Sequence, residues 1–214
     1  MPAPRSRQLV VMARWPAPGR CKTRLAAGIG AAAAAAVQRR LTLHAITAAR
    51  RALQQLPARL ADGELVLAVA GLAAQRAQRW GRELGVDRVV LQGSGRLGAR
   101  LQRQWRRAGR EGCRRLVLIG SDLPELEPAE IAAAFLALEV SAWVLGPAWD
   151  GGYWLVGGRC PSPSPFIAPG TPIPWGRDGV LAATLTLAER HGIAPRLLAR
   201  RHDLDTPADL QRWR

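Results

Sequence analysis

The hydrophobic positions of the chain form two kinds of pattern, which alternate along most of its length. Short apolar runs predict buried strands, whereas apolar residues at steps of three and four predict amphipathic helices. Strands are expected at Gln8–Ala13, Glu64–Ala70, Arg88–Gln92, Leu116–Ile119, Ala142–Gly146, Tyr153–Val156 and Pro195–Ala199. Helices are expected at Ala31–Leu56, Leu72–Leu84, Arg96–Ala108, from Pro128 onward, at Arg177–His191 and from Pro207 onward.

This alternation predicts an α/β protein with a mostly parallel sheet and helices on both faces. The turn signal Asp150-Gly151-Gly152 precedes the strand at Tyr153–Val156. We therefore expect that strand to run antiparallel to its neighbours, which makes the sheet mixed. A chain of 214 residues fits one domain, and we assign residues 1–214 to it.

The strand at Leu116–Ile119 is followed by Gly120, Ser121, Asp122, Leu123 and Pro124. Proline cannot donate to a sheet ladder, so the strand must end before it. Open α/β sheets bind ligands beyond the carboxyl ends of their strands, and a carboxylate there can hold a divalent cation against phosphate oxygens. The alternative is that Asp122 only opens a turn or caps the next helix, and this stretch alone leaves both interpretations open.

A cationic loop, Arg14–Arg24, follows the first strand and contains the turn-forming Gly19. A basic, glycine-bearing loop between a strand and a helix is a common phosphate cradle. The loop is not a P-loop, because Cys21 stands where glycine must precede the lysine, and the dinucleotide motif G-x-G-x-x-G is absent. The loop thus predicts a phosphate site, with a solvated surface loop as the alternative.

The composition adds a formal charge of +15. This charge could serve nucleic-acid binding, or it could serve a small anionic substrate such as a nucleotide phosphate. However, Lys22 is the single lysine among 31 basic residues, and an arginine- and alanine-rich chain is typical of a GC-rich genome. Arginines gather on one face of the helix expected at Arg96–Ala108, but Trp105 lies on its apolar face. A solvated arginine face is therefore favoured over a base-stacking surface.

The cysteines and the apolar runs exclude further classes. Cys21, Cys113 and Cys160 form an odd set without a C-x-x-C pair, which argues against a disulfide framework and a structural zinc site. The apolar run Leu9–Ala13 is too short for a signal-peptide core or a membrane span. We therefore expect a cytoplasmic protein.

The second half carries three further segments of interest. Glycine pairs flank the aromatic residues around Tyr153, which permits close approach of a ligand to the backbone. Residues Arg159–Trp175 form a proline- and serine-rich loop of a length often found in lids and binding loops. Asp203 and Asp205 lie on an extended segment before Thr206, the expected N-cap of the last helix. We expect the two carboxylates to face opposite ways, so that one of them could meet Asp122 at the edge of the sheet.

Three motifs, in order, resemble a known family. They are VMARWPAPGRCKTRL at residues 11–25, IGSDLP at 119–124 with LGPAWDGGYWL at 145–155, and DLDTPADL at 203–210. The family is that of bacterial GT-A-type nucleotide-diphospho-sugar transferases labelled arsenosugar-biosynthesis-like glycosyltransferases. It is similar to the MobA-like and phospholactate guanylyltransferase-like nucleotidyltransferases. The resemblance implies a single Rossmann-like α/β/α sandwich of the GT-A type.

The resemblance also implies the roles of individual residues. The nucleotide-binding residues would be Ala13, Arg14, Gly19, Lys22, Thr23, Arg24, Gln92 and Ser121. The acceptor-binding residues would be Gly151, Gly152, Tyr153 and Trp175. Asp122 and Asp205 would hold Mg²⁺ or Mn²⁺. We assign catalysis to Lys22, Asp122 and Asp150, the last as a base if one is needed.

Two departures from the family pattern stand out. The family usually has lysine where Arg14 stands, and acidic residues where Arg96 and Ala99 stand. These departures point to a divergent acceptor or a weakened activity.

The resulting prediction is a metal-dependent glycosyltransferase that moves a sugar from a nucleotide-diphosphate sugar to a small acceptor, with neither membrane nor nucleic acid as partner. Such a transfer requires the charge of the leaving phosphates to be neutralised, which a metal ion and the cations Lys22 and Arg24 can do. The alternative is a nucleotidyltransferase that uses a nucleoside triphosphate and releases pyrophosphate. A nucleic-acid-binding protein and a family member that binds nucleotide without turnover are further alternatives.

Overall fold

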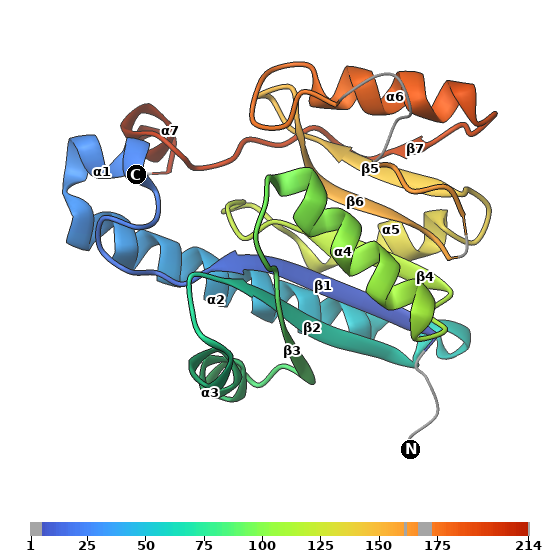
Figure 1. Cartoon of the computed structure of the whole chain (residues 1–214), viewed down its shortest axis with the longest axis horizontal. Helices are drawn as coiled ribbons and strands as arrows, with labels where there is room; N and C mark the ends of the chain where they lie inside the picture. Colours follow the sequence, from blue (N-terminus) through green and yellow to red (C-terminus); the bar gives the residue numbers. More distant parts are fainter. Residues whose placement is uncertain (1–5, 161, 167–172, 214) are drawn as a thin grey trace.

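The computed structural model describes residues 6–160, 162–166 and 173–213. Within these ranges the chain forms one seven-stranded sheet with the order β3-β2-β1-β4-β6-β5-β7 (Figure 1). Its strands are β1 (Arg7–Arg14), β2 (Gly63–Ala70), β3 (Arg88–Leu91), β4 (Arg115–Ile119), β5 (Trp143–Pro147), β6 (Tyr153–Arg159) and β7 (Arg196–Leu197). The predicted α/β class with one shared sheet is confirmed.

The sheet is mostly parallel with one inverted strand. Neighbouring strands from β3 to β4 all pair in parallel, and so do β5 and β7. Strand β6 is antiparallel to both β4 and β5. This inversion follows from the turn that the sequence predicted, in which the carboxylate of Asp150 accepts a hydrogen bond of 2.9 Å from the backbone N–H of Gly152.

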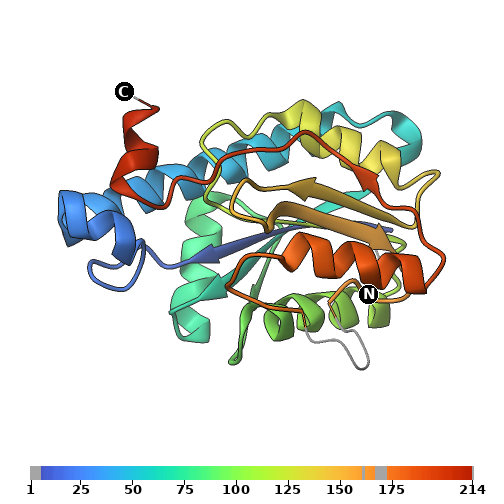
Figure 2. The ribbon, with the colours of Figure 1, turned by 90° about the horizontal axis from the view of Figure 1, so that it is seen from above.

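Helices cover both faces of the sheet (Figure 2). They are α1 (Thr23–Ile29), α2 (Ala31–Gln55), α3 (Ala74–Leu84), α4 (Leu97–Arg110), α5 (Pro128–Ala137), α6 (Val180–Arg190) and α7 (Pro207–Gln211), with a short 3-10 helix at Ala58–Leu60. Helices α2, α3 and α5 bury their apolar residues in one core, and α4 and α6 do so in a second core on the opposite face. The helices therefore leave the carboxyl ends of the central strands uncovered. We call this end of the sheet, where the strands finish, the accessible edge.

Two differences from the prediction concern the starts of helices, and part of one expected loop lies outside the described residues. The segment expected as a loop up to Arg24 already becomes helix α1 at Thr23. Helix α6 begins at Val180 and not at Arg177, because Gly179 precedes it in a left-handed conformation with φ of 91°. Much of the expected loop after Arg159, namely 161 and 167–172, lies outside the described residues.

The last part of the chain crosses the accessible edge of the sheet and ends beside α1 (Figure 1). Leu204 is buried in a small third cluster with Leu25 and Leu41 of α1 and α2. Its backbone N–H donates a hydrogen bond of 2.9 Å to the carbonyl of Asp122. This bond holds residues 203–205 against the end of β4.

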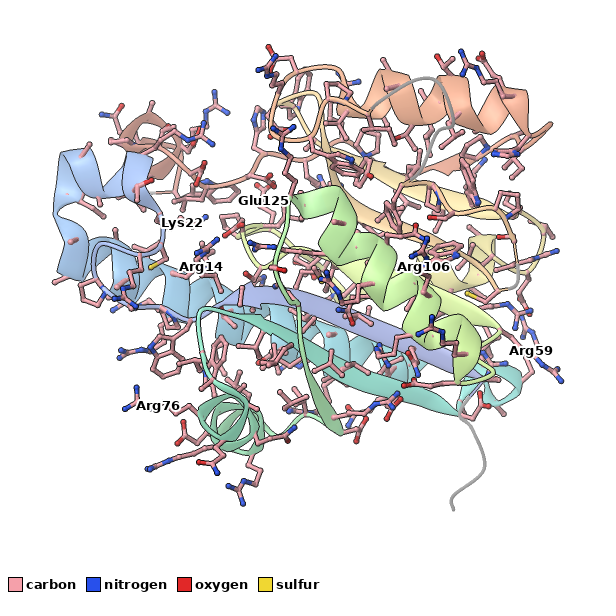
Figure 3. The ribbon with its side chains drawn as sticks, viewed as in Figure 1. Arg14, Lys22, Arg59, Arg76, Arg106 and Glu125 are labelled. Atoms are coloured by element: carbon pink, nitrogen blue, oxygen red, sulfur yellow. The ribbon has the colours of Figure 1, made fainter. Side chains whose placement is uncertain are left out.

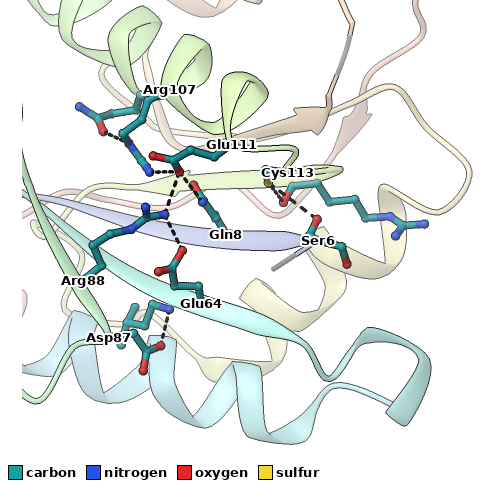
Figure 4. A network of polar contacts seen from close by, with 11 residues as sticks. Ser6, Gln8, Glu64, Asp87, Arg88, Arg107, Glu111 and Cys113 are labelled. Carbon is teal, nitrogen blue, oxygen red and sulfur yellow. Dashed lines mark hydrogen bonds and ion pairs between the residues drawn. The ribbon is translucent and has the colours of Figure 1, made fainter. Parts of the chain in front are cut away.

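At the opposite edge of the sheet a polar network joins the starts of the strands (Figure 4). Arg88 contacts the carboxylates of Glu64 and Glu111 at 2.6 and 2.8 Å. Burial alone would raise the pKa of Glu111, but the hydrogen bond from Gln8 and the charges of Arg107 and Arg88 outweigh it, and the pKa is lowered. The network is structural and lies far from the accessible edge described above.

Candidate active site

A cavity of about 530 Å³ opens where β1 and β4 end. Figure 3 shows Arg14 and Lys22 at this end of β1, whereas Arg59 and Arg76 lie well away from it. Most of the residues predicted for the site line the cavity: Ala13, Arg14, Lys22, Arg24, Gln92, Ser121, Asp122, Asp150, Gly152, Tyr153, Trp175 and Asp205. The structure thus brings together residues from all three sequence motifs.

Three predicted site residues do not line this cavity. Gly19 forms a turn with φ of 72°, and Thr23 is exposed at the start of α1. Gly151 instead contacts the start of α6, where its carbonyl accepts a hydrogen bond of 2.9 Å from Leu181. Their part is to shape the turns that carry Lys22 and Asp150 to the cavity.

Lys22 is the most constrained residue of the site. Among the residues that the structure describes, it is the one non-glycine residue with positive φ, at 48°. That conformation costs about 1–3 kcal/mol and persists only where surrounding contacts maintain it. Its carbonyl accepts a bond of 2.8 Å from Ala26 in the first turn of α1, and its side chain is 2% exposed.

The ammonium group of Lys22 lies among oxygen atoms. It is 2.6 Å from Oδ1 of Asp122 and 3.8 Å from Oδ1 of Asp205, and it donates a hydrogen bond of 2.5 Å to the carbonyl of Leu204. Arg24 forms a second ion pair with Asp205. The side chains of Asp122 and Asp205 are 46% and 34% exposed, so both remain open to the cavity.

Asp203 adds a further carboxylate to the cavity wall. Burial is the largest cause that raises the pKa of Asp203, and the charges of Asp122 and Asp150 add to it. The charge of Lys22 opposes this rise, and the net result is a pKa of about 7. Asp203 and Asp205 were expected to face opposite ways, with one of them near Asp122, and this expectation is wrong, since both line the cavity with Asp122. The reason is that residues two apart on an extended segment point to the same side.

The opposite wall is aromatic. The rings of Tyr153 and Trp175 meet edge to face with centroids 6.2 Å apart. Trp175 also covers Gly98 in the first turn of α4, where a Cβ atom would stand 2.1 Å from the indole Nε1. Burial raises the pKa of Tyr153, so its hydroxyl stays protonated. This wall offers a mainly apolar surface beside the acidic one.

Gln38, on α2, lines the cavity and was not predicted. It is 4% exposed, and its amide Nε2 donates a bond of 3.2 Å to the hydroxyl of Ser121. The signal in the sequence is a polar pair, Gln38 and Thr42, one turn apart on the buried face of α2.

The predicted base-binding residues are tied to the backbone of the sheet. Gln92 is buried, and its Nε2 donates to the carbonyls of Ala13 and Ala68 at 3.1 and 2.9 Å. Arg103 of α4 donates hydrogen bonds to the carbonyls of Gln92 and Ser94 and so joins this segment to the helix. Gln92 therefore fixes the floor of the cavity between β1, β2 and α4.

The carboxylates of the cavity suit the predicted divalent cation. Asp122 and Asp205 offer the carboxylate oxygens that Mg²⁺ and Mn²⁺ prefer, and Mg²⁺ usually keeps several waters beside one or two carboxylates. Within the described ranges, no three carboxylate, imidazole or thiolate groups converge on one point. The residues fit a metal held by two carboxylates and water, and they do not form a dedicated cage.

A family model for uncharacterized proteins conserved in bacteria, DUF2064, matches residues 52–177. The chain belongs to this family. The match includes Asp122 and Asp150, whereas Lys22, Asp203 and Asp205 lie outside it. A search of the curated proteins found no match.

Several solved structures resemble this DUF2064 protein. A candidate nucleotide-diphospho-sugar transferase from Desulfovibrio desulfuricans G20 is 28% identical with a TM-score of 0.80, covering 96% of this chain and 84% of that one. Glucosyl-3-phosphoglycerate synthase from Mycobacterium tuberculosis, solved with Mn²⁺, UDP and glucosyl-3-phosphoglycerate, is 15% identical (TM-score 0.57; 97% and 75% covered). The inositol-1-phosphate CTP transferase from T. maritima is 13% identical (TM-score 0.55; 97% and 91% covered).

These likenesses confirm the predicted Rossmann-like fold. The Desulfovibrio structure, at 28% identity, supports the prediction of an enzyme of the transferase class. The narrower relations to arsenosugar-biosynthesis-like and MobA-like proteins stay predictions. Among the described residues, no helix is both long and apolar enough to cross a membrane.

Proposed function

We propose that this DUF2064 protein is a metal-dependent transferase that moves a sugar from a nucleotide-diphosphate sugar to a small acceptor. The observation that carries the proposal is the division of the cavity into two chemical surfaces. Cations and carboxylates from the ends of β1 and β4, the start of α1 and the last segment line the cavity, and Tyr153 and Trp175 add an aromatic surface to it. A phosphate-bearing donor suits the charged surface, and the ring of a sugar or an acceptor suits the aromatic one.

The donor would bind at the carboxyl ends of β1 and β4, as ligands do in open α/β sheets. Arg14 and Arg24 line this end of the cavity and would neutralise phosphate charge. The buried amide of Gln92 holds the backbone of Ala13 in place, which gives the base a rigid floor. Preorganised cations of this kind stabilise the charge that develops on a leaving phosphate.

Asp122 and Asp205 would hold the divalent cation. When bound, the metal supplies positive charge to the phosphate oxygens. Ser121 precedes Asp122, and the hydrogen bond from Gln38 orients its hydroxyl. The backbone bond from Leu204 to the carbonyl of Asp122 sets the distance between the two carboxylates.

Asp150 would accept the proton of the acceptor hydroxyl. It lies at the exposed rim of the cavity, next to Tyr153. One of its oxygens, Oδ1, accepts the N–H of Gly152, which orients the carboxylate and leaves Oδ2 for the acceptor. A general base must lie within hydrogen-bond reach of the proton that it abstracts, and a rim position next to the aromatic wall meets this condition for a small acceptor.

The test is turnover with a panel of nucleoside triphosphates and nucleotide sugars in the presence of Mg²⁺ or Mn²⁺, with several sugar and phosphorylated acceptors. We expect a nucleoside diphosphate to be released from a nucleotide sugar. Asp122→Asn should lower the rate at least a hundredfold. Asp178→Asn, which removes an exposed carboxylate that also lines the cavity, serves as the matched control and should retain most of the activity.

A nucleotidyltransferase is the second candidate, because the same fold occurs in the CTP transferase named above. It would use the same cations and carboxylates, but it would release pyrophosphate from a triphosphate. Metal-dependent pyrophosphate release without any turnover of nucleotide sugars would refute the glycosyltransferase proposal and support this one. Tight nucleotide binding without either reaction would indicate a binding protein.

A further inference from the structure

The ammonium group of Lys22 occupies the space between the two carboxylates that we propose as metal ligands. It lies 2.6 Å from Oδ1 of Asp122 and 3.8 Å from Oδ1 of Asp205, and 2.5 Å from the carbonyl oxygen of Leu204. A divalent cation held by the same two carboxylates would need oxygen atoms that now face this ammonium. Lys22 and the metal therefore compete for one set of ligands.

The backbone directs the lysine into this position. Lys22 adopts its left-handed conformation as the residue before helix α1, and its side chain is almost wholly buried. The stem therefore points toward the carboxylates and away from solvent. Leaving this position would require a new anionic partner, because a buried ammonium without one is costly.

The phosphates of a nucleotide would be such a partner. Lys22, Arg14 and Arg24 line the same cavity, so phosphate oxygens bound there would lie within the range of the flexible lysine stem. We propose that Lys22 is a resident counter-ion of the Asp122–Asp205 pair, which a divalent cation can displace fully only when nucleotide phosphates receive the ammonium. This inference rests on the proposed function, since it takes Asp122 and Asp205 as the metal ligands.

The consequence is a linkage between two ligands. Without nucleotide, the metal must displace an ammonium that has no other anion to bind, so metal affinity is low. With nucleotide, the phosphates take over the ammonium and the carboxylates become free. Thermodynamic reciprocity then requires that the metal raise the nucleotide's affinity by the same factor. Lys22 would act as a positioning residue that keeps the metal from binding alone.

The experiment measures Mn²⁺ binding by the full chain without nucleotide, from the loss of the electron paramagnetic resonance signal of free Mn²⁺. Lys22→Met removes the competing charge and should tighten Mn²⁺ binding at least tenfold relative to the unchanged chain. Arg20→Met is the matched control. It removes one positive charge from an exposed residue of the same loop and should leave the Mn²⁺ affinity within twofold of the original.

Two further variants keep the result unambiguous. Lys22→Gln removes the same charge while retaining a hydrogen-bond donor for the carbonyl of Leu204, and it should show the same gain if Lys22→Met does not fold. Adding Asp122→Asn to either variant should abolish the gain, which places the bound Mn²⁺ at this pair. Unchanged or weaker Mn²⁺ binding by the folded Lys22 variants would overturn the inference.

The outcome is independent of turnover. If the Lys22 variants bind Mn²⁺ more tightly and the unchanged chain turns over no nucleotide, the inference is supported and the proposed function is refuted. Metal-dependent turnover by the unchanged chain, together with unaltered Mn²⁺ affinity in the variants, would support the proposed function and overturn the inference.

Discussion

The replacement Asp203→Asn tests the electrostatics of the cavity through protein stability. Asp203 lies among Asp122, Asp150, Asp205 and Lys22. Burial and the neighbouring carboxylates together raise its pKa from an ordinary value of 3.8 to about 7. The folded protein therefore opposes the ionisation of this group, whereas the unfolded chain does not.

The size and sign of the effect follow from the shift. Each pKa unit corresponds to about 1.4 kcal/mol, so a shift of roughly three units is worth at most about 4 kcal/mol. Because Asp203 is only partly shielded from solvent, we expect about 2–4 kcal/mol. Between about pH 4 and pH 7 the folded state keeps a proton that the unfolded state has lost, so Asp203 lowers the stability as the pH rises through this window.

The assay is urea unfolding of the unchanged chain and of Asp203→Asn at steps from about pH 4 to about pH 9. The two free energies of unfolding should be similar near pH 4, because a protonated carboxyl and an amide are both neutral. The advantage of the variant should then grow up to about pH 7 and stay constant above it. A difference that does not change with pH would refute the assigned environment of Asp203.

The replacement Lys22→Met checks the effect of Lys22 on the pKa of Asp203. Lys22 lowers the pKa of Asp203, so Lys22→Met should move the upper end of the pH window to higher values. A shift to lower pH would contradict the placement of the ammonium beside these carboxylates.

Three further predictions concern packing and hydrogen bonds near the site and at the opposite edge of the sheet. Gly98→Ala would place a Cβ 2.1 Å from the indole of Trp175, so the ring must move, and we expect a net loss of about 1–3 kcal/mol in urea unfolding with altered tryptophan fluorescence. Unchanged stability and fluorescence would contradict this contact. Gln38→Ala and Ser121→Ala, alone and together, should show a coupling energy of about 1 kcal/mol in a double-mutant cycle, and strict additivity would exclude the bond between them. Arg88→Met leaves the two carboxylates that it bridges without this cation, so thermal unfolding should show a loss of about 1–3 kcal/mol, reduced by high salt.

The strand-end motif shows what could be predicted from local pattern. The apolar run that ends at Ile119, with Gly120 and Pro124 after it, predicts both the end of β4 and the place of Asp122 just beyond it. The turn at Asp150 likewise predicted the inversion of β6. In each case a few neighbouring residues determine the backbone by their own hydrogen-bonding and φ preferences.

Helix α1 shows where local pattern fails. Its N-cap is Lys22, which makes no capping bond with its side chain, so the usual start signal of serine, threonine, aspartate or asparagine before the helix is missing. Contacts with the last segment of the chain support the helix instead, as in the shared cluster of Leu25 and Leu204. Such support cannot be seen in a window of ten or fifteen residues.

Asp203 and Gln38 show the same limit for the site. The burial of Asp203 depends on the bond between Leu204 and the carbonyl of Asp122, which joins residues more than eighty positions apart. Gln38 left a weak signal as a polar residue on the buried side of α2, but its partner Ser121 is equally distant in sequence. A sequence pattern can suggest that a polar residue is buried, whereas only the fold shows what it binds.

The shape of a lysine side chain suits the position of Lys22, the single lysine of the chain. A compact ammonium can lie within 2.6 Å of the Asp122 carboxylate and still donate to the carbonyl of Leu204. A planar guanidinium presents its donors in a rigid fork and cannot concentrate them on oxygens that surround one point. In a chain with 31 basic residues and one lysine, arginine serves wherever charge alone is needed. The proposed exchange of this ammonium for a divalent cation would favour a small cation at position 22, where the lysine occurs.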